Sequence, residues 1–300
     1  MSGDGGVTPA DDRLHPPGSP HPLWTETAWF AFMVPERGLA GTIYPVFRPN
    51  LGVASLGVYV WDASACEPWR VPYGLGLWHL PLPAGDLDDL SLAGLRLRCL
   101  EPLARYALAY EDGDRIALEL DYVGLLPPRG VGIGGGRGHL DQPCRVRGRL
   151  RLRGEEIAVD CLDLRDRSWS VRDDRGSVRA SYSYAMASER DGFLAAGFEH
   201  EGASRLVAGF LLRDGVAAAL AAGTREVVAR ECGHPARVRL QARDALGRSL
   251  EAEGACVSRL ANPATPGLFA WMSLTDWQFD GRRAFGSDQD VWSPDRLPLP

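Results

Sequence analysis

The sequence predicts an all-β protein made of two similar antiparallel β-barrel or sandwich units. Most of the chain alternates apolar and polar residues in short runs separated by turns with Gly and Asp, a pattern typical of antiparallel hairpins. The 35 glycines and 22 prolines leave few stretches long enough for an amphipathic helix. A weak internal repeat relates the two halves of the chain.

The hairpins are predicted from turn residues that tolerate positive φ. In the first half, residues 103–110 and 115–122 flank the turn 111–114, and residues 146–152 and 157–164 flank the turn 153–156. In the second half, strands 206–212, 238–242 and 269–279 end at the turns 213–215, 244–247 and 280–281. The alanine-rich segment 215–229 favours helix by composition, but we predict a strand with a short loop.

The repeat divides the chain into two domains. A shift of 132 residues superposes Arg105 on Arg237, Asp112 on Asp244 and Leu118 on Leu250, which places a strand, a turn and a strand on equivalent elements. We therefore predict domains at residues 21–164 and 165–300. Residues 1–20 are acidic and rich in Pro and Gly, which indicates a disordered arm.

The basic residues exclude several mechanisms. All 33 Lys+Arg positions are arginine, so Schiff-base chemistry, pyridoxal phosphate anchoring and the phosphate-binding lysines of kinases and P-loop enzymes have no amine to use. Guanidinium groups stay charged, so arginine binds or orients and another group must move protons. The net charge of −6 argues against nucleic acid or an anionic membrane as partner.

The remaining composition indicates a cytoplasmic protein. The first residues have neither the basic nor the apolar region of a signal peptide, and no apolar run reaches the length of a membrane span. The six cysteines show no zinc spacing and are expected to be reduced. We expect no metal and no cofactor, and the oligomeric state stays open.

The segment 163–173 is the most distinctive in the chain, with three arginines, three aspartates and a tryptophan. If Asp166 is enclosed beside Trp169, loss of solvation would raise its pKa and make it a proton donor. The alternative, which composition alone favours, is a salt-bridge corner that fixes the angle between two barrels, with Trp169 as a plug.

This segment also resembles a known signature. The run from Leu164 to Arg172 is similar to the R-D-H-S-W-G-x-R motif of lipocalin-like proteins related to AttH and carotenoid 1,2-hydratase (hydroxyneurosporene synthase). Residues 26–30 and 138–143 are also similar to bacterial members. The resemblance implies two consecutive lipocalin-like β-domains with a ligand cavity, and hydratase or cyclase activity on isoprenoid or polyketide-like substrates without a cofactor.

The signature is matched only in part. Asp166 and Trp169 match directly, but Arg165 and Arg167 replace histidines of the hydratase form, and Ser170 replaces its glycine. Arginine cannot supply the proton that histidine would, so Asp166 becomes the main candidate acid. This departure also keeps a non-catalytic lipid or pigment carrier, and a structural or interaction module, as alternatives.

A second candidate site is His139 with Asp141 and Gln142, after the glycine-rich loop 130–138. The loop formally contains G-x-G-x-x-G, but no helix follows, so a dinucleotide site is rejected. We predict either a mobile lid that delivers His139 as a general base or hydrogen-bond donor, or a flexible surface loop.

Further candidates line the expected cavity. The arginines from Arg145 to Arg153 recur at every second position and predict a solvated strand face in preference to an anion site. Aromatic residues would form the walls and could stabilise a carbocation, although barrel core is the commoner role. The predicted substrate-binding residues are Trp169, Arg165, Arg172, Gln142, Tyr182, Tyr184, His79 and Trp271.

The sequence therefore predicts a cofactor-independent hydratase or cyclase for a hydrophobic isoprenoid, terpenoid or polyketide-like molecule. Asp166 is the expected acid, and His139 or Asp141 assists water or deprotonation.

Overall fold

The computed structural model describes residues 6–173, 178–200, 203–265 and 267–296. These residues form long antiparallel strands and four short 3-10 helices, Pro9–Asp12, Pro35–Arg37, Pro49–Leu51 and Pro294–Arg296. The predicted all-β class is confirmed. In the described part of the chain, no helix is long and apolar enough to cross a membrane.

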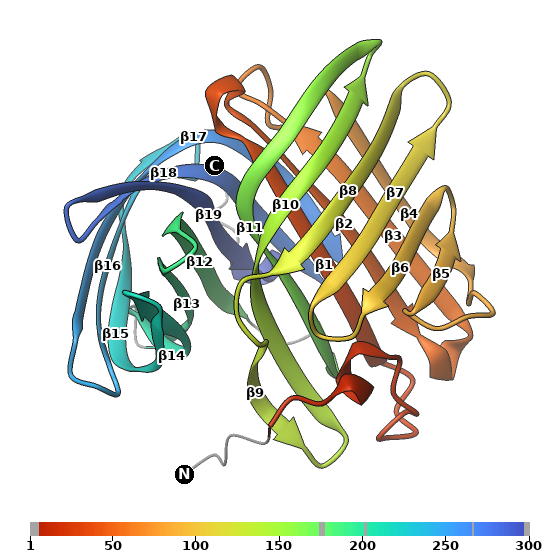
Figure 1. The fold of residues 1–300 in the computed structure, drawn as a ribbon, viewed down its shortest axis with the longest axis horizontal. Coiled ribbons are helices and arrows are strands. Elements are labelled where there is room, and N and C mark those ends of the chain that lie inside the picture. The colour runs from red at the N-terminus through yellow and green to blue at the C-terminus, as the bar shows by residue number, and fades with distance from the viewer. Residues whose placement is uncertain (1–5, 174–177, 201–202, 266, 297–300) are drawn as a thin grey trace. The chain divides into compact units, whose positions relative to one another are not determined.

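The first unit is an open antiparallel sheet (Figure 1). Its strands are β1 (Trp24–Val34), β2 (Leu39–Arg48), β3 (Val53–Trp61), β4 (Tyr73–Pro81), β5 (Asp89–Leu92), β6 (Leu95–Glu101), β7 (Arg105–Asp112), β8 (Ile116–Gly124), β9 (Arg129–Gly134), β10 (Arg137–Leu152) and β11 (Glu155–Val171). They are ordered β4-β3-β2-β1-β11-β10-β8-β7-β6-β5, and β9 pairs with β10. The pairing of β1 with β11 joins segments far apart in the sequence.

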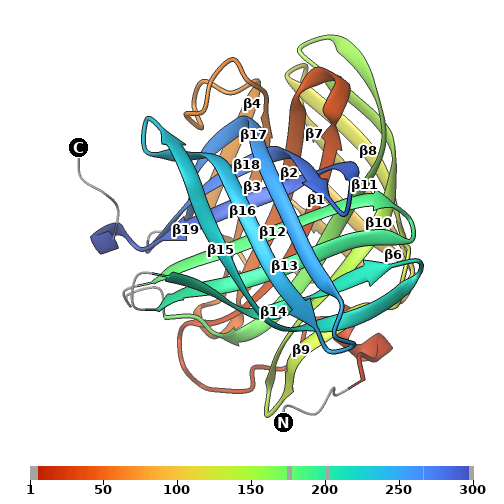
Figure 2. The ribbon, with the colours of Figure 1, turned by 90° about the vertical axis from the view of Figure 1, so that its left-hand side faces the viewer.

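The second unit is a closed barrel of strands β12 to β19 (Figure 2). The strands are β12 (Arg179–Ser188), β13 (Asp191–His200), β14 (Ala203–Arg213), β15 (Val216–Glu231), β16 (His234–Asp244), β17 (Ser249–Thr265), β18 (Leu268–Phe279) and β19 (Arg282–Trp292). An apolar cluster that includes Phe193, Leu211 and Trp277 fills part of its interior. Pairing of β12 with β19 leaves this barrel without an edge.

The predicted hairpins are confirmed because their turns are encoded locally. Strands β7 and β8 pair around Gly113, and β16 and β17 pair around Gly247, and both glycines have positive φ. These two hairpins are the elements that the 132-residue repeat superposes. Residues 216–231 form one strand, β15, so the strand prediction is right and the loop is not found. The glycine-rich segment predicted as a lid or surface loop belongs instead to the β9–β10 hairpin.

The division between the units differs from the predicted boundary at residues 164 and 165. That position lies inside β11, which continues to Val171, because the arginine- and aspartate-rich segment is strand and not a corner. The first unit comprises Met1–Val34, Gly41–Val60 and Pro72–Asp173. The second comprises Pro35–Ala40, Trp61–Val71 and Asp174–Pro300.

The N-terminal segment is ordered in residues 6–20, which corrects the prediction of a disordered arm there; residues 1–5 lie outside the described part. At the start of its short helix Pro9–Asp12, the backbone N–H and the hydroxyl of Thr8 donate to the Asp11 carboxylate at 2.6 and 2.9 Å. Asp12 is buried, and its carboxylate accepts a hydrogen bond from Arg165 Nη1 at 2.9 Å. Composition predicted disorder because the segment has few apolar residues, whereas ionic contacts to β11 hold it in place.

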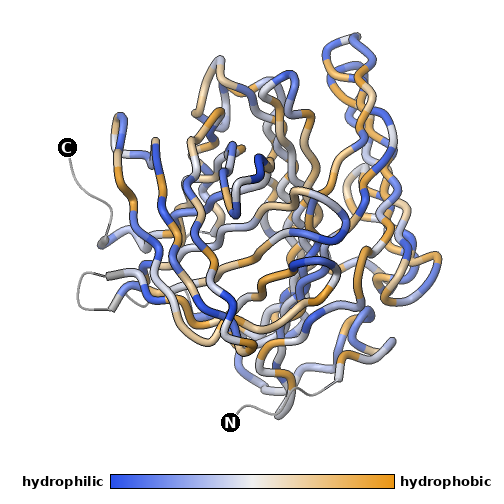
Figure 3. Tube along the Cα trace, turned by 60° about the vertical axis from the view of Figure 1, so that its left-hand side comes forward, coloured by the Kyte–Doolittle hydropathy of each residue, from blue (hydrophilic) through white to orange (hydrophobic). Residues whose placement is uncertain are grey.

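Alternation along the strands separates core from surface, and Figure 3 shows hydrophobic and hydrophilic stretches interleaved along the chain. On β10, Val146 and Leu150 are buried while Arg147 and Arg149 are exposed on the other face. Arg147 pairs with Asp160 and Arg149 with Glu119. The period-two arginines therefore form the solvated face that the sequence predicted.

Candidate functional site

The three residues predicted as catalytic lie together on one face of the first unit. In the β10–β11 ladder, Asp141 is directly opposite Asp166 and His139 is opposite Ser168. Cross-strand partners share a face of the sheet, as do residues two apart on a strand. On the other side of β11, Trp29 of β1 is the direct partner of Asp166.

His139 and Asp141 form a close pair. His139 Nε2 is 2.8 Å from Asp141 Oδ1, and the Asp141 side chain is buried while the imidazole keeps 31% of its surface exposed. Burial alone would lower the pKa of His139. Asp141, through charge and hydrogen bonding, and the nearby Asp166 outweigh this effect and raise the pKa of His139 to about 9. The pair is therefore an imidazolium facing a carboxylate at neutral pH.

Asp166 has a pKa suited to proton transfer. Burial raises its pKa because the carboxylate loses solvation, and the Asp141 carboxylate raises it further. The positive charges of His139, Arg172 and Arg165 oppose this shift without cancelling it. The pKa of Asp166 stays raised to about 6, so its protonated and ionised forms are both populated near neutrality.

Hydroxyl groups continue the same face beside Asp166. Thr27 Oγ1 and Ser168 Oγ are 2.8 Å apart. Arg172 donates through Nη2 to Ser168 and through Nη1 to the Tyr44 hydroxyl at 3.1 Å. The Tyr44 ring meets Trp29 edge-on with centroids 5.2 Å apart. Protonatable groups, hydroxyls and aromatic rings thus share one surface.

Sequence reasoning missed part of this cluster. Ser168 and Thr27 received no role, and Trp29 and Tyr44 stood only among the aromatic residues. The alternation of Thr25, Thr27 and Trp29 was a usable signal, because it puts two hydroxyls and an indole on one strand face. Nothing local in the sequence indicated that this strand would pair with β11.

Trp169 does not enclose Asp166, which corrects the predicted arrangement. The two residues are three apart on an extended strand and therefore project from opposite faces. Trp169 stacks on His15 of the N-terminal segment, with ring centroids 4.2 Å apart and an interplanar angle of 18°. Gly138 is its cross-strand partner, where a Cβ would come within 2.4 Å of the indole, so this close approach requires glycine.

Arg165 and Gln142 also lie on the face opposite Asp166. Arg165 Nε donates to Gln142 Oε1 at 2.6 Å, and its guanidinium lies 4.0 Å from the centroid of the Tyr106 ring. Together with its bond to Asp12, these contacts commit Arg165 to anchoring the N-terminal segment, while the Gln142 amide donates to the carbonyl oxygens of Leu103 and Leu126. Their predicted contact with substrate stays a prediction, and any such contact would lie on the face opposite Asp166.

Arg167, which replaces a histidine of the resembled signature, has the same anchoring role. Its Nη1 donates to the carbonyl oxygens of Asp11 and Arg13, both at 2.9 Å, and its Nη2 donates to Glu26 at 2.7 Å. Of the predicted arginines, only Arg172 joins the Asp166 face.

The other predicted substrate-binding residues lie elsewhere. His79 is exposed on β4 with a positive φ of 58°. Tyr182 and Tyr184 project from β12 on the face opposite Ser183, whose side chain faces the barrel interior. Trp271 lies on β18 as the cross-strand partner of Asp290, within 5.3 Å of the His234 ring. The last three residues belong to the second unit.

The part of the chain that the structure describes was searched for side chains that could bind a metal ion together. Within residues 6–173, 178–200, 203–265 and 267–296, no group of three or more His, Cys, Asp or Glu side chains could hold a metal ion.

Three solved structures share this fold along most of their length. An AttH candidate from Nitrosomonas europaea has a TM-score of 0.68 at 16% identity, covering 97% of this chain and 98% of that one. Kievitone hydratase from Nectria haematococca has a TM-score of 0.61 at 8% identity, covering 98% and 95%. CghA, solved with Sch210972, has a TM-score of 0.58 at 12% identity, covering 91% and 89%.

These similarities show that the chain shares its fold with the AttH candidate, as the sequence predicted. No curated protein matches the chain. The family model described as domain of unknown function DUF7064 matches residues 8–288, which span the N-terminal anchor, the Asp166 face and the barrel. The chain therefore belongs to the DUF7064 family.

Proposed function

We propose that this protein adds water to, or closes a ring in, a hydrophobic isoprenoid or polyketide-like molecule by acid-assisted alkene chemistry without a cofactor. One observation carries the proposal. A carboxyl group with a pKa of about 6, Asp166, lies directly across the ladder from the charged pair of Asp141 and His139. This arrangement suits general acid–base catalysis, in which the acid must be protonated near the working pH and able to recover its proton.

The proposed reaction begins with the neutral form of Asp166. Its proton is transferred to one carbon of a substrate double bond, which leaves a carbocation on the neighbouring carbon and a carboxylate on the enzyme. In hydration, water forms a C–O bond to the cation and loses a proton to the Asp166 carboxylate. In ring closure, a second double bond forms a C–C bond to the cation, and proton loss again restores the acid.

The surrounding groups support this sequence in different ways. The negative charge of Asp141 favours the protonated form of Asp166, and the hydroxyls of Ser168 and Thr27 can orient water. The π-faces of Trp29 and Tyr44 suit a positively charged intermediate. The fold similarity to a protein named kievitone hydratase agrees with the reaction class, although the residues above are the basis of the proposal.

The experiment is a product analysis in heavy water. The purified chain is incubated with farnesol and geranylgeraniol as acyclic isoprenoid probes, and products are separated by liquid chromatography with mass detection. Hydration adds one water to the probe, whereas ring closure gives an isomer of changed retention. Both reactions place one solvent deuterium on carbon, because the acidic proton of Asp166 exchanges with heavy water. Asp166→Asn should reduce either product by about 100-fold or more.

The matched control is Asp160→Asn, which changes an exposed aspartate on the same strand that pairs with Arg145 at the surface. This variant should retain wild-type turnover. Full turnover in Asp166→Asn would remove the acid role from this residue. A probe retained in stoichiometric amount and chemically unchanged would instead favour a lipid or pigment carrier.

A further inference from the structure

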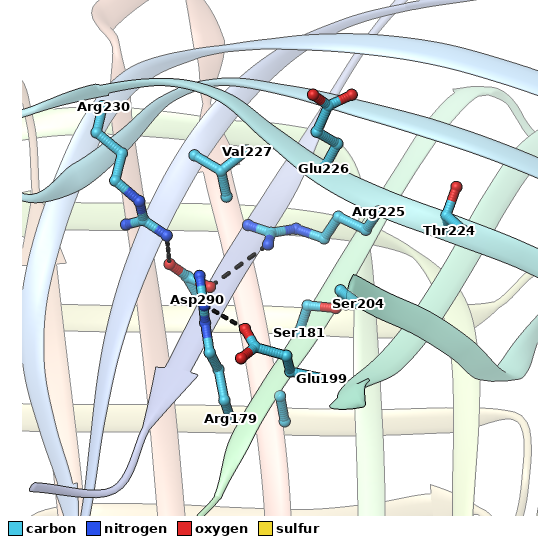
Figure 4. A pocket seen from close by; sticks show the side chains of 11 residues that line it. Arg179, Ser181, Glu199, Ser204, Thr224, Arg225, Glu226, Val227, Arg230 and Asp290 are labelled. Carbon is cyan, nitrogen blue, oxygen red and sulfur yellow. Dashed lines mark hydrogen bonds and ion pairs between the residues drawn. The ribbon is translucent and has the colours of Figure 1, made fainter. Parts of the chain in front are cut away.

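We infer that the barrel of the second unit contains a separate binding pocket for a small, neutral, polyhydroxylated molecule of monosaccharide size. The pocket has a volume of about 340 Å³ and is formed by β12, β13, β14, β15 and β19. The charged residues of its lining are Arg179, Arg225, Arg230, Glu199, Glu226 and Asp290 (Figure 4). None of these residues belongs to the Asp166 face.

The floor of the pocket is a buried ionic network. Arg225 donates through Nε and Nη2 to the two carboxylate oxygens of Asp288, at 2.9 and 2.6 Å, and its Nη1 lies 3.4 Å from Asp290. Ser183 Oγ donates to Asp288 at 2.7 Å. The four side chains are almost completely removed from solvent. They therefore present a rigid, preorganised set of donors and acceptors.

The rim carries further charges around a tryptophan. Arg230 Nη2 donates to Asp290 at 2.6 Å, and Arg179 pairs with Glu199. The guanidinium groups of Arg179 and Arg230 lie over the Trp292 ring, at 4.0 and 5.4 Å from its centroid. Unlike Arg225, these two arginines keep 27% of their side-chain surface exposed, so they remain accessible to a ligand.

Stability alone does not account for this cluster. A buried ion-pair network is often no more stable than apolar residues of the same volume, since desolvation offsets the attraction between charges. The same barrel has an apolar core around Phe193, Leu211 and Trp277, so the fold fills its interior with hydrophobic side chains elsewhere. The buried ionic network departs from this apolar filling, and such departures concentrate at functional sites.

The balance of charge selects the class of ligand. Among the described residues, three guanidiniums (Arg179, Arg225 and Arg230) face three carboxylates (Glu199, Asp288 and Asp290). Burial favours the neutral acid, but Arg225 and Arg230 hold the pKa of Asp290 below its ordinary value, so this carboxylate stays charged. Glu226 also lines the pocket, but it points away from the cluster in Figure 4 and its charge is balanced by Arg239 at 3.6 Å.

A hydroxyl group matches such a lining because it both donates and accepts hydrogen bonds. Vicinal hydroxyls can accept from a guanidinium while they donate to the adjacent carboxylate. A carboxylate ligand only accepts and would meet three like charges, and an ammonium ligand only donates and would meet three guanidiniums. Ser181 and Ser204, whose hydroxyl oxygens are 3.2 Å apart, add neutral polar contacts.

The size of the pocket agrees with this class. Its volume falls within the range of about 300–1,000 Å³ that is typical of small-molecule sites. With a liquid volume of about 30 Å³ per water, it holds about ten waters, which is room for one sugar or inositol ring.

The test is isothermal titration calorimetry of the full chain with four neutral probes, D-glucose, D-galactose, D-mannose and myo-inositol, each titrated alone. Sodium acetate and methylammonium chloride are the charged comparators. We expect saturable binding of at least one neutral probe and none of the charged probes. Absence of binding by all four neutral probes, or binding of acetate alone, would overturn the inference.

Two charge variants and one hydroxyl variant locate the binding. Glu199→Gln leaves the lining with an excess positive charge and should shift its preference toward acetate, whereas Arg230→Gln should shift it toward methylammonium. Ser181→Ala removes a hydroxyl without altering an ion pair. It should lower the affinity for the neutral probe by about 5- to 10-fold, as expected for one hydrogen bond of about 1 kcal/mol.

The matched control is Arg283→Gln, which breaks the surface pair with Asp276 on β18 in the same unit. It should bind the neutral probe as the wild type does. Circular dichroism checks that each variant is folded. Unchanged binding of the neutral probe in folded Ser181→Ala, Glu199→Gln and Arg230→Gln would show that the pocket is not the site.

Discussion

Asp166 and Asp141 are direct cross-strand partners in the β10–β11 ladder, so their two carboxyl groups project from the same face of the sheet. Burial disfavours the ionised form of Asp166 and raises its pKa, and the neighbouring Asp141 carboxylate adds to this effect. The protonated form of Asp166 is thereby populated near pH 6, beside the pair of His139 and Asp141. The pH dependence of activity follows from this arrangement.

Activity should fall as pH rises through about 6, because the reaction needs the protonated form of Asp166. Above that pH, kcat/KM is expected to drop about tenfold per pH unit on the product assay described above. Asp141→Asn removes the neighbouring negative charge. In the pH profile of this variant, kcat/KM should therefore begin to fall at a lower pH than in the wild type. A rate that increases across this range in the wild type would be incompatible with an acid role for Asp166.

Asp166→Asn should stabilise the fold at neutral and alkaline pH. Asp166 has a pKa raised from 3.8 to about 6, so its contribution to stability is most favourable below about 3.8 and is lost as pH rises through about 6. Asparagine carries no charge and avoids this loss. We expect the Tm of the variant to exceed that of the wild type by roughly 2–6 °C above neutrality.

Thermal unfolding followed by circular dichroism across pH checks this expectation. The gain should disappear below about pH 4, where the wild-type carboxyl is protonated in both states. Asp160→Asn, at an exposed position of the same strand, should show no pH-dependent gain. Equal Tm values for Asp166→Asn and wild type at every pH would mean that burial of Asp166 has no energetic consequence.

His139 should stabilise the fold on the acid side of its titration. Its pKa is raised from 6.5 to about 9, so the stability that it contributes is fully present below about 6.5 and is lost as pH rises through about 9. The Tm difference between wild type and His139→Gln should therefore shrink over that interval. A difference that grew with rising pH would contradict the charged pair with Asp141.

Asp12 of the N-terminal segment should be energetically coupled to Arg165 of β11. Arg165→Met leaves the carboxylate of Asp12 buried without its guanidinium, and we expect a loss of about 3–5 kcal/mol in unfolding free energy. In the double variant with Asp12→Leu, part of this loss should be recovered, with a coupling of about 1–3 kcal/mol. Urea denaturation measures both quantities.

Arg149→Met supplies the control for this cycle, because Arg149 and its partner Glu119 are both largely exposed and their pair is worth about 0–1 kcal/mol. Limited proteolysis gives a second readout, since release of the anchor should expose residues 6–20 to cleavage. Additive effects of the two substitutions would show that Arg165 and Asp12 are not coupled.

Features encoded by neighbouring residues were predictable. The turn at Asp112 and Gly113 and the turn at Asp244 to Gly247 identified their hairpins, and the period-two arginines of β10 identified a solvated face. The choice of Asp166, His139 and Asp141 came from the resemblance and from residue chemistry. Their juxtaposition agrees with that choice, although their catalytic roles stay predictions.

Long-range pairing could not be read from the sequence. The contact of β1 with β11 sets Trp29 beside Asp166, and the contact of β12 with β19 sets Ser183 beside Asp288. Both pairings join strands from distant parts of the chain, and they depend on the register of whole sheets. The opposite directions of Asp166 and Trp169 were available from strand periodicity alone and were missed.

The sequence by itself determined an all-β chain, the positions of its hairpins and the absence of any lysine that could carry chemistry. It also marked Asp166 as the acid candidate, since arginines stand where the resembled family has histidines. Only the tertiary structure decided which strands flank β11 and what each of its faces contacts. Arg165 and Arg167 hold the N-terminal segment on one face, and Asp166 lies with His139 and Asp141 on the other. The reason is physical: turns and alternation depend on adjacent residues, whereas burial and pKa depend on strands brought together from distant parts of the chain.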